Sequence, residues 1–117
     1  MTINEYQKEA LRTAPTRQTG ARWSDWVKPL ENGLMGLNGE AGEAIDILKK
    51  HLFQGHPLDR EHLAKELGDV AWYLAVSADA LGYTLEEILE MNVKKLRLRY
   101  PEGFEIKRSV SRKTDDV

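Results

Sequence analysis

The chain has 117 residues, a mass of 13.4 kDa and a formal net charge of −2 at pH 7, which suits one domain. The absence of cysteine excludes disulfides, thiolate metal sites and a cysteine nucleophile. No apolar run of about 18 residues occurs and the first residues do not have the pattern of a secretory signal, so we expect a cytoplasmic protein without a membrane partner. Acidic residues predominate before residue 94 and basic residues after it. No overall basic field indicates binding to nucleic acid.

Four helical segments, and no convincing strand, are predicted along the chain. The first covers about residues 2–13, where Thr2 and Glu5 have the spacing of a capping box. The second covers about residues 30–52, where apolar residues recur at steps of three and four and form one stripe. Glycine stands at every third position from 33 to 42, which weakens this helix. Gly55 and Pro57 are expected to end it.

The third segment, about residues 59–81, begins with Asp59 as the expected N-cap and ends before Gly82. The fourth begins at Thr84 and ends before Pro101, and residues 102–117 are expected to be irregular. Two long helices joined by a short connection pack antiparallel, and the other two complete a bundle. The expected fold is therefore all-α and four-helix-bundle-like. Apolar stripes on more than one side of the long helices predict a homo-oligomer.

Carboxylates flank the apolar stripes of the second and third helices as two matched pairs. Glu40 and Glu43 stand three positions apart on one helix, and Glu66 and Asp69 stand three apart on the next. If the helices bring the pairs together, their mutual repulsion requires cations. Oxygen ligands with no His or Cys nearby favour Mg²⁺, with Mn²⁺ as a substitute, over zinc. The alternative, that these acids are ordinary surface charges, stays open on the pattern alone.

The three histidines give no support for the rival di-iron carboxylate site. Such a site needs Glu-x-x-His on two helices, and no histidine follows one of the four carboxylates by three positions. We interpret His51, His56 and His62 as exposed residues at helix ends and in a loop.

Three segments, taken in order, resemble one protein family. They are Gly36–Glu43 (GLNGEAGE), Lys65–Val70 (KELGDV) and Lys95–Pro101 (KLRLRYP), with 22 residues between Glu43 and Glu66. Over about residues 30–104 the chain resembles the MazG-type all-α nucleotide pyrophosphohydrolases. The glycines of the second segment belong to the family pattern, so a helix is expected there after all. Residues 1–104 would form the MazG-like domain and residues 105–117 a basic tail.

The resemblance implies a metal centre and a reaction. It implies that Mg²⁺ ions bridging the phosphates of a nucleotide are held by Glu40, Glu43, Glu66 and Asp69. It further implies hydrolysis of a (deoxy)nucleoside triphosphate to the monophosphate and pyrophosphate, as nucleotide-pool housecleaning. Water attack at the α-phosphorus requires charge neutralisation on the attacking and leaving oxygens. Glu40 and Glu43 are the catalytic candidates, with Glu40 preferred as acceptor of the water's proton.

Substrate contacts are expected from basic and aromatic side chains. Arginine suits bidentate contact with phosphate, although Lys and Arg near a helix C-terminus also interact favourably with its dipole. The candidates for phosphate are Lys50, Lys95 and Arg99, with Arg108 and Arg112 expected in a tail that orders on nucleotide binding; Asn92 resembles a family asparagine that contacts sugar or phosphate. For the base, Tyr73 is preferred over Trp23, Trp26 and Trp72. We expect Trp72 to pack in the core, and Trp23 and Trp26 to pack rather than lie in water.

Two functions of other classes remain open. One is a helical interaction module that retains the fold without turnover, and the other is a regulator that binds nucleotides without hydrolysing them. The complete set of four acids argues against the first, because loss of activity usually erodes at least one ligand.

Overall fold

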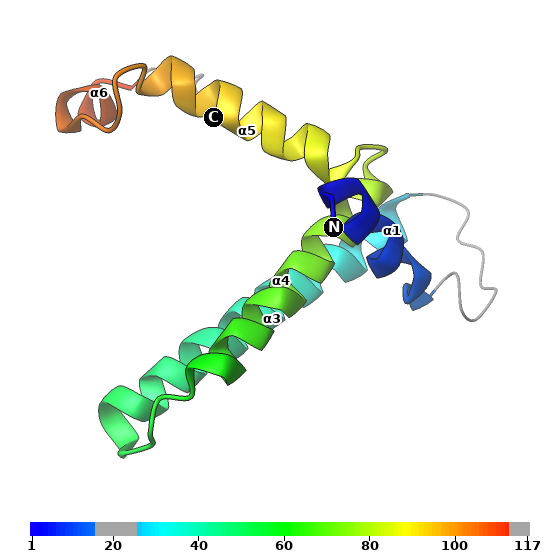
Figure 1. Ribbon diagram of the computed structural model, residues 1–117, viewed down its shortest axis with the longest axis vertical. Helices are drawn as coiled ribbons and strands as arrows, with labels where there is room; N and C mark the ends of the chain where they lie inside the picture. Colours follow the sequence, from blue (N-terminus) through cyan, green and yellow to red (C-terminus); the bar gives the residue numbers. More distant parts are fainter. Residues whose placement is uncertain (16–25, 113–117) are drawn as a thin grey trace. The chain divides into compact units, whose positions relative to one another are not determined.

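The computed structural model describes residues 1–15 and 26–112, in which every regular element is a helix (Figure 1). The expected all-α class is therefore confirmed. The chain forms two compact units, residues 1–85 and 86–117. The helices are α1 (Ile3–Arg12), α3 (Val27–Gln54), α4 (Arg60–Ala80), α5 (Leu85–Arg99) and α6 (Ile106–Val110).

The ends of α1 and α4 follow the local signals in the sequence. Thr2 Oγ1 accepts from the backbone N–H of Glu5 at 3.1 Å, and Glu5 Oε2 accepts from the N–H of Thr2 at 2.8 Å, so the predicted capping box is confirmed. Asp59 is the N-cap of α4, as predicted, and its Oδ1 accepts from the N–H of His62 at 3.0 Å. Gly82 follows this helix with a φ of 82°. Glycine adopts that left-handed conformation without a steric penalty.

Helix α3 is longer than the predicted 30–52 at both ends. It begins at Val27, because Pro29 falls in the first turn, where its missing N–H would have no intrahelical partner in any case. Gly55, with a φ of 71°, ends the helix as expected, and its N–H donates to the carbonyl of Lys50. His51 stabilises the connection to α4, since its Nδ1 lies 2.8 Å from the carbonyl oxygen of His56 and must donate to it.

Two of the four spaced glycines explain why α3 and α4 pack closely. A methyl group at Gly33 would overlap Ser77 Oγ, and one at Gly36 would overlap the ring of Tyr73. Gly39 and Gly42 have nothing within 4 Å of such a methyl group. The helical cost of glycine is therefore offset by interhelical contact at the first two positions only.

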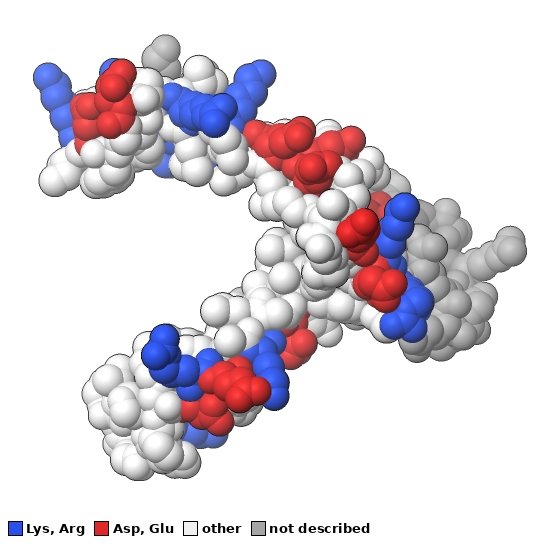
Figure 2. Space-filling view, in the orientation of Figure 1, with Lys and Arg blue, Asp and Glu red and all other residues white. Residues whose placement is uncertain are grey.

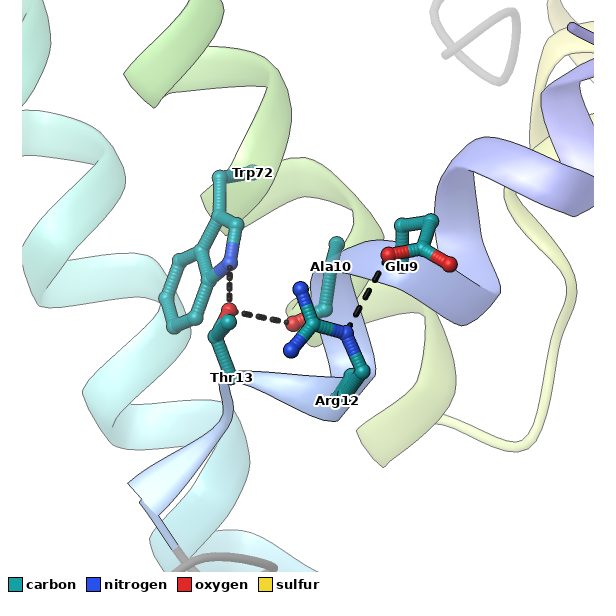
Figure 3. A network of polar contacts seen from close by, with 5 residues as sticks. All are labelled: Glu9, Ala10, Arg12, Thr13 and Trp72. Carbon is teal, nitrogen blue, oxygen red and sulfur yellow. Dashed lines mark hydrogen bonds and ion pairs between the residues drawn. The ribbon is translucent and has the colours of Figure 1, made fainter.

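The core of residues 1–85 lies where α1 packs on α4. Ala10, Ala75 and Leu85 are buried there, and Tyr6 and Trp72 pack against them. Trp72 Nε1 donates to Thr13 Oγ1 at 2.9 Å, and the Thr13 hydroxyl donates to the carbonyl of Ala10 at 2.8 Å (Figure 3). Core packing of Trp72, as expected, is confirmed, and its indole N–H is paired with the C-cap of α1.

A buried glutamine joins three helices at this core. Gln7 is 6% exposed, its Nε2 donates to the carbonyl of Ala75 at 3.1 Å, and its Oε1 accepts from the N–H of Leu85 at 3.0 Å. One side chain of α1 thus satisfies the first backbone N–H of α5 and contacts the last turns of α4. A buried polar group is stable here because both of its ends are paired.

The second unit contains α5 from Glu86 onward and the segment after it. Acidic side chains, Glu86 and Glu87, stand in the first turn of α5, and basic ones, Arg97 and Arg99, in its last turn, a separation of colour that is visible in Figure 2. Both placements favour the helix dipole. The expectation of an irregular segment from residue 102 is wrong in part. After Gly103, with a φ of 95°, residues 106–110 form α6, because this stretch contains neither glycine nor proline.

Many large apolar side chains of the described residues are exposed. They include Leu52 (60%), Phe53 (80%) and Leu67 (58%) in the first unit, and Leu98, Phe104 and Val110 in the second. Trp26 is 56% exposed, so the expectation that it packs is wrong within one chain, and Trp23 lies outside the described residues. Among the described helices, none is both long and apolar enough to cross a membrane.

Candidate metal centre

Three carboxylates converge between α3 and α4. One oxygen each from Glu40, Glu43 and Glu66 lies within 4.8 Å of the other two. Glu40 and Glu43 face the same way because they are three positions apart on α3. The antiparallel packing of α4 brings Glu66 to them. Three oxygen donors at this separation suit a hard divalent cation such as Mg²⁺ or Mn²⁺.

The electrostatics of the cluster act on Glu40. Partial desolvation raises the pKa of Glu40, and contact with the Glu66 carboxyl group and the negative charges of Glu43, Asp69 and Glu66 raise it further. All of these causes disfavour the ionised form of Glu40. A bound cation would reverse that penalty, because it favours the ionised form of every oxygen around it.

Glu66 provides the test of whether a cation fits. Its side chain is only 12% exposed, and its buried Oε2 has no hydrogen-bond partner among the residues that the structure describes. A buried unpaired carboxylate oxygen costs free energy unless a donor or a metal satisfies it. The other oxygen, Oε1, lies 3.1 Å from Nε2 of His62. The unsatisfied oxygen beside two more carboxylates therefore fits a cation.

Asp69 lies beside this group and is not part of the close triplet. Its carboxylate is exposed, yet its charge contributes to the raised pKa of Glu40. Burial raises the pKa of Tyr6, and the charge of Asp69 adds to that shift. Tyr6 of α1 therefore lies in the field of the carboxylates. No motif in the sequence indicated this, because the docking of α1 on α4 decides it.

His62 is the residue near the cluster that the sequence analysis missed. It is 55% exposed in the first turn of α4, as expected of a helix-end residue. The expectation that no histidine lies near the carboxylates is wrong, however, because His62 contacts Glu66. The signal was present in the i, i+4 spacing of residues 62 and 66.

Two further candidates of this unit have partners of their own. The Tyr73 ring packs against Gly36 and meets Trp72 edge to face, with ring centroids 4.8 Å apart. Lys50 Nζ lies 3.0 Å from Asp46 Oδ2, one turn back on α3, and Lys49 binds the other oxygen at 3.1 Å. Figure 2 shows the mixed acidic and basic side chains on this part of the molecule.

The remaining candidates lie in residues 86–117. Asn92, Lys95 and Arg99 stand at i, i+3 and i+7, on one face of α5, with Lys95 and Arg99 half-buried. Arg108 on α6 lies 3.7 Å from Glu105, and Arg112 follows that helix. Their roles in substrate binding stay predictions.

Comparisons with known proteins assign the chain to a family. The sequence model of the MazG nucleotide pyrophosphohydrolase domain matches residues 29–104, which include all four carboxylates. "Gene 37 protein" of Mycobacterium phage L5 is 36% identical over 107 residues, covering 88% of this chain and 92% of that protein. No solved structure matches the chain. On the family match, the chain belongs to the MazG nucleotide pyrophosphohydrolase family.

Proposed function

We propose that the protein hydrolyses (deoxy)nucleoside triphosphates to the monophosphate and pyrophosphate in a Mg²⁺-dependent reaction, which removes unwanted nucleotides from the pool. The observation that carries this proposal is the buried, unpaired Oε2 of Glu66 beside Glu40 and Glu43. Family membership supports the reaction class. The carboxylate triplet supports the metal requirement.

The carboxylates have distinct tasks in this proposal. Glu40, Glu43 and Glu66 hold the cation, and Asp69 completes the ligand set from the next turn of α4. When bound, Mg²⁺ supplies neutralisation of phosphate charge at the attacked α-phosphoryl group. Glu40 and Glu43 are the catalytic residues, and Glu40 accepts the proton of the attacking water. Glu40 suits this role because it is half-buried and adjoins both other members of the triplet.

Substrate contacts complete the proposal. Tyr73 stacks on the base, and its edge-to-face contact with Trp72 keeps the ring in one orientation. The phosphate and sugar contacts are proposed for Lys50, Asn92, Lys95, Arg99, Arg108 and Arg112. Lys50 must exchange its ion pair with Asp46 for a phosphate, which costs little because exposed pairs are weak.

Pyrophosphate release over a panel of nucleoside triphosphates, with and without Mg²⁺, tests the proposal. Glu43→Gln and Glu66→Gln should each reduce turnover below about a tenth of the unsubstituted rate, more than about 1.4 kcal/mol of barrier. An amide retains the shape of the carboxylate and cannot offset the charge of the cation. Glu61→Gln is the matched control, because Glu61 is an exposed glutamate of α4 that pairs with Lys65.

Three results would contradict the proposal. If a Glu43 or Glu66 variant retains more than a tenth of the rate, that residue is not a ligand of the catalytic metal. Turnover that does not depend on Mg²⁺ would contradict the proposed metal requirement. Nucleotide binding without pyrophosphate release would instead support a regulator that binds nucleotides without hydrolysing them.

We also propose that the chain assembles as a homodimer or homotetramer. Gly42, Ile45, Leu48, Leu52 and Phe53 line an apolar depression on α3, and Leu52 and Phe53 are mostly exposed in one chain. Apolar surface of this kind is covered in stable proteins. Light scattering at micromolar concentration should give at least twice 13.4 kDa, whereas a mass near 13.4 kDa would contradict assembly.

A further inference from the structure

We infer that His62 is a positioning residue of the metal centre, which holds the Glu66 carboxylate so that one oxygen stays free for the cation. This inference rests on the proposed function, because it presupposes that Glu66 is a metal ligand. It adds to the four carboxylates a residue with which the metal itself makes no contact.

The polarity of the contact follows from its chemistry. His62 Nε2 and Glu66 Oε1 are 3.1 Å apart. An ionised carboxylate can only accept a hydrogen bond, so Nε2 carries the hydrogen and donates. Carboxylate hydrogen bonds with histidine are charge-assisted and orient the acid more firmly than a contact with mobile water.

The contact with His62 gives the two oxygens of Glu66 different surroundings. Oε1 is satisfied by His62, whereas the buried Oε2 accepts no hydrogen bond from the described part of the chain. The carboxylate can rotate about its last torsion, since terminal torsions of glutamate are broad. The histidine donor holds one oxygen of the carboxylate, Oε1, so the buried Oε2 is the oxygen that remains for a cation bound with Glu40 and Glu43.

The position of His62 is itself fixed by the first turn of α4. Its backbone N–H is bound by the N-cap Asp59 at 3.0 Å, and residues 62 and 66 are one helical turn apart. The nearby cation Lys65 pairs with Glu61 at 3.3 Å. His62 is thus the side chain of this turn that contacts Glu66, and groups that hold a metal ligand in place commonly affect metal affinity strongly.

Titration of the full-length protein with Mn²⁺ alone, followed by the loss of the free-ion electron paramagnetic resonance signal, tests the inference without any substrate. His62→Leu retains a side chain of similar bulk without a donor and should weaken Mn²⁺ binding by about 10–100-fold. His62→Gln returns an N–H donor to the same helical position and should restore affinity to within about threefold of the unsubstituted protein, under about 0.7 kcal/mol. His56→Leu makes the same chemical change at an exposed loop histidine outside the carboxylate cluster and should leave affinity unchanged.

The metal-free melting temperature separates positioning from a structural role. His62 is more than half exposed, so His62→Leu and the unsubstituted protein should melt within a few degrees of each other without metal. If His62→Leu binds Mn²⁺ as tightly as the unsubstituted protein, the positioning role of His62 is overturned and the metal centre is not. Equal losses in His62→Leu and His62→Gln would also overturn it, because the donor would not be the cause. No Mn²⁺ binding by the unsubstituted protein would overturn the metal centre and this role together.

Discussion

The two ends of the α3–α4 pair differ in how closely their side chains pack. At the end near α1, Ala75, Val76, Ser77 and Ala78 are at most 7% exposed, and Gly33 and Gly36 let the helices approach. At the other end, every residue from 51 to 62 is exposed. Small side chains allow the two helices to pack closely, whereas large apolar side chains of the far end, such as Leu52 and Phe53, are left mostly exposed. The carboxylates lie between these two regions.

This difference indicates which contacts stabilise each end. The end near α1 is stabilised by contacts within residues 1–85 alone, including the network of Trp72, Thr13 and Ala10 (Figure 3). The far end buries little, so its order depends on α3 and α4 themselves and on whatever covers Leu52 and Phe53. Substitutions at the two ends should therefore affect different properties, namely the stability of the chain and its assembly.

The largest effect on stability is expected at Gly36. Gly36→Ala places a methyl group in the ring of Tyr73 and should lower the free energy of unfolding by about 1–3 kcal/mol, the usual cost of overpacking. Gly39→Ala, three positions on, meets nothing within 4 Å and should raise that free energy by up to about 1 kcal/mol through helix propensity. Urea denaturation measures both.

The two substitutions should have opposite signs because only the methyl group at residue 36 meets a neighbouring ring. If Gly36→Ala were as stabilising as Gly39→Ala, the close approach of α3 and α4 at Tyr73 would be contradicted.

A somewhat smaller loss is expected at Gln7. Gln7→Leu keeps the bulk and removes both hydrogen bonds, which leaves the buried N–H of Leu85 unpaired. The free energy of unfolding should fall by about 1–2 kcal/mol, the cost of one buried unpaired group. Lys8→Leu, at the next and exposed position of α1, is the control. Hydrogen exchange of the Leu85 amide should accelerate in the Gln7 variant only, and unchanged exchange would contradict the bridge.

A substitution at the far end of the α3–α4 pair should change the assembly of the protein more than its stability. Phe53→Ser removes a side chain that is 80% exposed, so the stability of the single chain should change by less than about 0.5 kcal/mol. If this surface lies between copies, the same change should shift the mass in light scattering toward a smaller species. Gln54→Ser, at an exposed neighbouring position that does not line the depression, is the control. Unchanged mass in Phe53→Ser would place the interface elsewhere.

The smallest effect concerns Asp46. Hydrogen bonds from Lys50 and Lys49 lower the pKa of Asp46 below its ordinary value of 3.8, so the folded state favours the charged form. Its contribution to stability is complete above the ordinary pKa and is lost as the pH falls through the lower folded value. Asp46→Asn should therefore lower the free energy of unfolding slightly at neutral pH, and its difference from the unsubstituted protein should disappear as the pH falls below about 4. Because the pair is exposed, about 1 M salt should remove most of the difference, and a difference that persists would contradict screening.

Much of the fold and part of the site could be predicted from local pattern. Caps at Thr2 and Asp59, the glycine stops and the apolar stripes depend on neighbours within one or two turns, so they are legible in the sequence. The i, i+3 spacing of each carboxylate pair is equally local. The 106–110 helix was missed because five residues carry too weak a pattern, without a side-chain hydrogen bond at the N-cap.

What the sequence by itself determined was the four longer helices, the caps of α1 and α4, and the acids that line one face of each long helix. The tertiary structure decided which contacts these residues make. It brought Glu40, Glu43 and Glu66 together and left Asp69 beside them, because the register of two antiparallel helices sets the distances between their side chains. It separated Gly33 and Gly36 from Gly39 and Gly42, which look alike in the sequence. It placed Gln7 against residues 68 and 78 positions away, a pairing that depends on the packing of distant segments and leaves no periodic signal.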